Sequence, residues 1–212
     1  MPSLRLRFLE QPLLSVLVHF LEDGRWGSLV DTAVEGQSLT AEDQLFILMQ
    51  AGLYLTATRG VAAPEARICH ERAEPLCHSL KDPRLLCIAL RGQFRYALNA
   101  EKLSAALQIV ERIYSLAQEQ NAAALMMEAY NGLAITLLSL GDFESARQYA
   151  SRGVQIWRSG NVQSYAEDFH SPVVGCLCYG GMSAWHLGEI ASCRTATAEA
   201  ISLAKELNDR NG

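Results

Sequence analysis

Two groups of cysteine and histidine residues are the first candidates for chemistry in this sequence. The groups are Cys69, His70, Cys77 and His78, and then His170, Cys176, Cys178 and His186. Zinc prefers thiolate and imidazole ligands, and structural zinc sites usually supply them as C-x2-C or H-x3–5-H pairs. Neither group has this spacing. We therefore expect no metal site, and we expect the cysteines to act as small buried hydrophobic residues.

Sequence signatures of catalysis are also missing. Asp168 and His170 are close in sequence, but no G-x-S-x-G turn supplies a nucleophile for them. No G-x-G-x-x-G or G-x-x-x-x-G-K loop is present to hold a nucleotide. The sequence therefore predicts no catalytic residue, no cofactor and no enzyme activity. An enzyme built on the cysteine and histidine groups is the alternative.

Binding chemistry is indicated instead by two arginines and an asparagine. Arg91 and Arg95 are four residues apart, so a helix places both on one side. With Asn131 from the next repeat, two guanidinium groups and an amide could hold an acidic peptide or a C-terminal carboxylate. The alternative is that the arginines pair with acidic neighbours or stay solvated.

The composition indicates which elements must position these residues. Of 212 residues, 50% are hydrophobic, 8% are aromatic and only 19% are charged. This mixture, rich in small residues, favours closely packed helices over sheets. The net charge of -5, without a basic cluster, predicts no nucleic-acid partner.

The sequence also predicts no membrane segment. The longest apolar run, from Pro12 to Leu21, is interrupted by His19, and it is shorter than the ~20 residues of a membrane helix. Glu10 and Gln11 break the N-terminal apolar stretch, so we expect no signal peptide. We expect a cytoplasmic protein.

A helix-turn-helix pattern recurs along the chain. Its turns lie at Gly60, Glu101, Gly141 and Gly188, about 40 to 47 residues apart. Before the third turn, Tyr130, Leu133, Ala134 and Leu137 form one apolar stripe, and Asp142 can cap the helix that follows. On that helix the small residues Ala146, Ala150 and Gly153 permit close packing, and Cys193 stands at such a position in the next copy.

About ten helices are expected from these patterns. They lie near residues 9–22, 26–35, 41–58, 64–80, 83–99, 102–119, 122–140, 143–157, 173–187 and 189–208. Residues 1–40 should form a helical pair or cap, and residues 41–212 a repeat array with repeats near 41–80, 83–120, 122–158 and 173–208. Pro75 falls inside a helix and should kink it or end it early.

The turns and small residues resemble the tetratricopeptide (TPR) pattern. The similarity is good over Tyr130 to Arg158, fair over Leu177 to Lys205, and weaker in the earlier copies. More narrowly, Ala57 to Leu207 resembles the TPR region of large bacterial signalling ATPases of the adenylate-cyclase and Ser/Thr-kinase types. The resemblance implies an all-α, right-handed solenoid of stacked helix pairs. It implies a non-catalytic protein-interaction module, regulatory or scaffolding, within a larger bacterial signalling protein.

In such an array the first helix of each pair lines the concave binding surface. The residues assigned to this surface are Gln50, Tyr54, Arg91, Arg95, Asn99, Glu128, Asn131, Ile135, Cys178, Met182 and Trp185. The expected partner is a protein or peptide, and it would be acidic if Arg91 and Arg95 bind it. Because no polar capping helix follows Leu207, a homodimer is also expected. The alternative function is a sensor in which Tyr54, Met182 and Trp185 line a pocket for a small effector.

Overall fold

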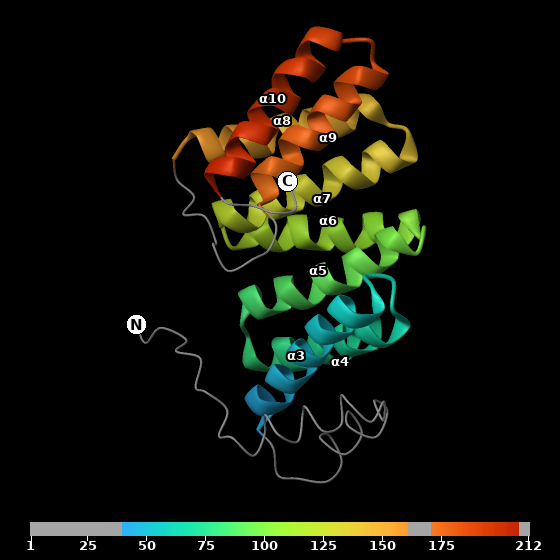
Figure 1. The fold of residues 1–212 in the computed structure, drawn as a ribbon. Coiled ribbons are helices and arrows are strands. Elements are labelled where there is room, and N and C mark those ends of the chain that lie inside the picture. Colours follow the sequence, from blue (N-terminus) through green and yellow to red (C-terminus); the bar gives the residue numbers. More distant parts are fainter. Residues whose placement is uncertain (1–39, 161–170, 208–212) are drawn as a thin grey trace. The chain divides into compact units, whose positions relative to one another are not determined.

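The computed structural model describes residues 40–160 and 171–207, and all regular structure in these ranges is helical (Figure 1). The helices are α3 (Ala41–Arg59), α4 (Pro64–Leu80), α5 (Pro83–Asn99), α6 (Leu103–Glu119), α7 (Ala123–Leu140), α8 (Phe143–Arg158), α9 (Pro172–His186) and α10 (Ile190–Glu206). The all-α prediction is confirmed. The described ranges hold eight helices rather than about ten. The helices expected near 9–22 and 26–35, and the cap over residues 1–40, lie outside these ranges.

Local sequence signals explain where the helices begin and end. Thr40 and Asp43 form a capping box, in which the Asp43 amide donates to the Thr40 Oγ1 at 3.2 Å. Gly141 ends α7 with a φ of 85°, a left-handed conformation that glycine adopts without steric cost. Asp142 then accepts a hydrogen bond from the Ser145 amide at 3.1 Å, so its predicted capping role is confirmed.

Pro75 does not end its helix early. Helix α4 continues from Pro64 to Leu80, five residues beyond Pro75. A proline removes one backbone donor, so the carbonyl of Glu71 loses its helical partner. Both Pro75 and Glu71 lie on the exposed side of α4, where water can solvate that carbonyl. This exposure explains why the helix tolerates the proline.

The chain divides into two compact units, Met1–Asp82 and Pro83–Gly212. In the first unit α3 packs against α4. Gly52 permits this contact, because a Cβ at this position would lie 2.9 Å from the imidazole ring of buried His70.

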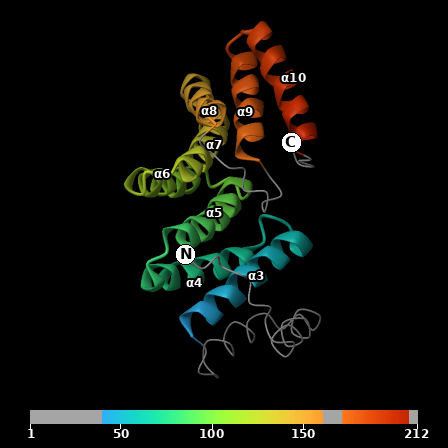
Figure 2. The same ribbon diagram turned by 90° about the vertical axis from the view of Figure 1, so that its left-hand side faces the viewer.

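In the second unit each helix from α5 to α10 packs against the next, and α7 also contacts α9. Figure 2 shows α9 and α10 side by side. One core cluster joins Phe94, Val110 and Leu133 from successive helices, and another joins Val154 of α8 to Cys176 of α9. Every helix therefore contributes to a core that it shares with its neighbours.

Close packing at small residues holds this stack together, and it also joins one helix pair to the next. A Cβ on Gly153 would lie 2.5 Å from the Cys176 Sγ, and one on Gly180 would lie 3.2 Å from the Ala150 Cβ. Helices α8 and α9 therefore approach more closely than larger side chains would permit.

Helix α7 is the most apolar part of this stack. Of the helices in residues 40–160 and 171–207, it alone meets the length and composition of a membrane-crossing segment. That is a weak indication, because a core helix meets the same requirements. Helix α7 contacts α6, α8 and α9 and buries Met127 and Leu133, which accounts for its composition.

Candidate functional site

The residues assigned to the binding surface lie on the first helix of each pair. They are Gln50 and Tyr54 on α3; Arg91, Arg95 and Asn99 on α5; Glu128, Asn131 and Ile135 on α7; and Cys178, Met182 and Trp185 on α9. Gln50 is half-buried and Tyr54 is exposed, and both belong to the first unit. We call the members in the second unit, on α5, α7 and α9, the first-helix strip.

The structure joins Arg91 to Glu128 across two helices of the strip. The Arg91 Nη1 lies 3.3 Å from the Glu128 Oε1, and both side chains are about three-quarters buried. The alternative in which an arginine pairs with an acidic neighbour therefore holds for Arg91. Asn99 donates its amide Nδ2 to the Arg95 carbonyl at 2.8 Å, so this amide is bonded within its own helix. An acidic ligand would have to compete with Glu128 for Arg91.

Asn131 carries an unused acceptor in the middle of the strip. Its Oδ1 is buried and has no hydrogen-bond partner among the described residues. A buried polar atom without a partner costs about 1–3 kcal/mol relative to a bonded one. The atom is also closed to solvent, so a ligand would reach it only by displacing a neighbouring side chain.

The α9 part of the strip is apolar and exposed. Met182 is 50% exposed and Trp185 is 58% exposed. An exposed tryptophan is a typical anchor in protein interfaces, because it buries a large area with few rotatable bonds. Trp157, in contrast, is half-buried and packs against the core cluster that contains Val154 and Cys176.

Two aromatic contacts support Trp185, and the sequence did not predict them. The His186 imidazole stacks on the Phe143 ring with centroids 4.2 Å apart and planes 2° from parallel. The Trp185 ring meets His186 edge-on at 4.8 Å. Phe143 begins α8 and His186 ends α9, so the stack joins the two helix ends. The LGDF and WHLG turns hold these residues, but no spacing rule relates one turn to the other.

A second aromatic series lies inside the second unit. The rings of Tyr114, Tyr130 and Tyr149, on three successive helices, are each 5.8 Å from the next. Burial is the main cause that raises the pKa of Tyr130. Arg152 lies over the Tyr149 ring at 5.3 Å from its centroid. These rings connect α6, α7 and α8 as packing residues.

The cysteines are positioned for packing rather than for nucleophilic chemistry. Four of the six are buried, and Cys178 and Cys193 are half-buried. Burial raises the pKa of Cys69 and of Cys77 to about 11, and it also raises the pKa of Cys176. A thiol with a raised pKa stays protonated near neutral pH and is a poor nucleophile. Within the described ranges, no three His, Cys, Asp or Glu side chains gather as a metal site would require.

No protein-family model matches this chain, and no curated protein matches its sequence. Its structure is similar to several solved structures. BtubC (BKLC) from P. vanneervenii matches with a TM-score of 0.67 and 12% identity, over 90% of this chain and 75% of that one. The apo form of RapI matches with a TM-score of 0.69 and 9% identity, over 91% and 69% of the two chains.

A Podosopora anserina putative kinesin light chain with nearly identical TPR-like repeats also matches. Its TM-score is 0.59 at 12% identity, over 91% of this chain and 93% of that one. These similarities show that the chain has a TPR-like repeat fold. The TPR pattern in the sequence is therefore confirmed at the level of the fold.

Proposed function

We propose that this chain is a non-catalytic, TPR-type protein-interaction module whose first-helix strip binds a peptide segment of a partner protein. The exposure of Trp185 carries the proposal, since the ring is 58% exposed while it contacts His186, which is stacked on Phe143. A side chain fixed in this way loses little freedom on binding.

The chemistry of the strip indicates what kind of segment would bind. Met182 and Trp185 favour an apolar side chain of the peptide, because each is at least half exposed. An acidic residue in the peptide would be recognised through Arg91 and Arg95, with Arg91 leaving Glu128.

The small-effector alternative has less support than the peptide. Pockets for small molecules bury most of the surface of their ligand. Met182 and Trp185 are each at least half exposed, so they present an open surface.

The wider context is proposed on the sequence resemblance. We place the module as a regulatory or scaffolding segment of a bacterial signalling ATPase. A cytoplasmic location is supported by the six cysteines, all of which are free thiols, since reducing compartments keep thiols in this state.

Selection of binders from a random peptide library against the full chain would test the function. For a selected peptide we expect Trp185→Ala to weaken binding by about tenfold or more, because it removes an anchor of the interface. Leu53→Ala is the matched control, since Leu53 is an exposed apolar residue, at 53%, on α3. Equal effects of the two substitutions, or the absence of any selected peptide, would contradict the proposal.

The acidic preference has its own test. Glu128→Gln removes the charge that holds Arg91, so binding of a selected peptide should strengthen if the peptide is acidic. Affinity for a neutral version of the same peptide should stay the same. No gain for the acidic peptide would show that Arg91 is structural.

A further inference from the structure

Helix α10 presents an uncovered side opposite its contact with α9. Ala200 and Ala204 are buried in the core shared with α9, while Ile190 and Ile201 are 46% and 51% exposed. The exposed side, which we call the outer face of α10, consists of Ile190, Ala191, Arg194, Ala198, Ile201 and Lys205; Thr197 lies at its edge, where its Oγ1 faces Gly181 of α9. Residues at these spacings share one side of a helix.

The equivalent positions on α8 indicate what kind of element fits the outer face of α10. Both helices follow a left-handed glycine, Gly141 or Gly188, so Ile201 stands at the position of Val154, and Thr197 at that of Ala150. On α8 these positions are only 7% and 1% exposed, because α9 packs against them. The outer face of α10 thus continues the contact that α8 makes with the next helix. Among the described residues, nothing comparable covers it.

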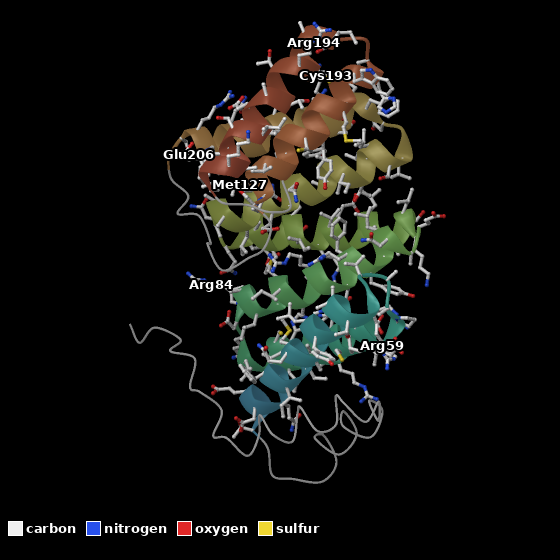
Figure 3. The ribbon with its side chains drawn as sticks, in the orientation of Figure 1. Arg59, Arg84, Met127, Cys193, Arg194 and Glu206 are labelled. Carbon is white, nitrogen blue, oxygen red and sulfur yellow. The ribbon has the colours of Figure 1, made fainter. Side chains whose placement is uncertain are left out.

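The charge on this face is entirely basic. Arg194 and Lys205 are exposed, and neither forms an ion pair with a described residue. Glu199 is bonded to Arg158 at 2.7 Å. Glu206 is the neighbour of Lys205 but projects about 100° away around the helix. Figure 3 shows Arg194 and Glu206 near opposite ends of α10.

We propose that the outer face of α10 docks an amphipathic helix of a partner protein, with small and apolar residues facing Ile201 and acidic residues facing Arg194 and Lys205. The partner helix needs small residues on its contact face, because the corresponding contact on α8 is made through Gly180 of α9. A second copy fits this face less well, because two α10 helices would bring the basic residues of both copies to one seam. This surface is distinct from the first-helix strip, so either proposal can fail without the other.

Two synthetic helical peptides of about four turns would test the proposal on the full chain. Both carry the same face of glycine, alanine and leucine, and one has glutamates while the other has lysines along the flanks. We expect the glutamate peptide to bind about tenfold more tightly, and its advantage to shrink as salt is added. Amide chemical-shift changes should map to α10.

Variants make the test specific. Ile201→Asp should weaken binding of the glutamate peptide by about tenfold, whereas Leu53→Asp, at similar exposure, should leave it unchanged. The double variant Arg194→Glu/Lys205→Glu should prefer the lysine peptide, an inversion that mere unfolding cannot produce.

Three results would overturn the proposal. One is equal affinity, or no affinity, for the two peptides. Another is shift changes confined to the first-helix strip. The third is a dimer, seen by light scattering, that Ile201→Asp dissociates, since a second copy would then be the occupant.

Discussion

Single glycines decide how closely the helices of the second unit approach. A Cβ on Gly132 of α7 would lie 2.5 Å from the Val110 Cγ2 of α6, closer than real Cβ atoms come to a neighbour. Val110 is itself 1% exposed and cannot turn away into solvent. The repeat pattern predicts small residues on the second helix of a pair; Gly132, on a first helix, is not among them, and the neighbour that each small residue meets emerges only from the fold.

Gly132→Ala should therefore destabilise the protein. Overpacking costs about 1–3 kcal/mol, which exceeds the ~1 kcal/mol that alanine gains over glycine inside a helix. Chemical denaturation would measure the change in the free energy of unfolding. The double variant Gly132→Ala/Val110→Ala should be less destabilised than the sum of the two single variants, by about 1 kcal/mol, because the two residues are in direct contact. Strictly additive effects would show that the helices separate to admit the methyl group.

At the scale of elements, the expected helix ends agree with the structure to within two residues from α3 to α10. Capping residues, glycines and prolines act locally, so their effect can be predicted from neighbouring residues. Pro75 is the exception, because its tolerance depends on which side of α4 meets water, a property of the packed pair.

Pro75→Ala should stabilise the first unit by roughly 2–3 kcal/mol. The substitution restores the amide that bonds the Glu71 carbonyl, and the gain is reduced a little because alanine leaves the unfolded chain freer. Thermal or chemical unfolding would measure the effect. Pro64→Ala is the control, because Pro64 begins α4, where no helical bond is lost. An equal gain from both variants would contradict the explanation.

The candidate site was predictable only in part. Its placement on first helices was predictable, because the spacing of the turns in the sequence defines which helix is the first of each pair. The ion pair between Arg91 and Glu128 joins residues 37 positions apart, and the stack of Phe143 on His186 joins two separate turns. Such contacts depend on the angle between helix pairs, which no local pattern encodes.

At the scale of the whole molecule, stability in the second unit is shared between neighbours. Helix α8 has α7 on one side and α9 on the other, whereas the outer face of α10 is uncovered among the described residues. Stacked repeats gain much of their stability at the contacts between adjacent repeats. Local opening should therefore be easier in α10 than in α8.

Hydrogen exchange would detect this difference. We expect backbone amides of α10 to exchange faster than those of α8 under native conditions, because fewer buried contacts must break for α10 to open. Mass spectrometry of peptides from each helix would measure the rates. Equal protection of α8 and α10 would contradict this expectation and show that the two helices open together.

The tyrosine series provides an optical signal for assembly of the stack. The planes of Tyr114 and Tyr130 are tilted by 41°, and those of Tyr130 and Tyr149 by 36°, in a fixed asymmetric arrangement. Aromatic rings held at close range in this way give circular dichroism in the near ultraviolet, which is lost when specific packing is lost. The three rings belong to α6, α7 and α8, so replacing Tyr130 by Phe and taking the difference spectrum would isolate a signal for the joining of two neighbouring helix pairs.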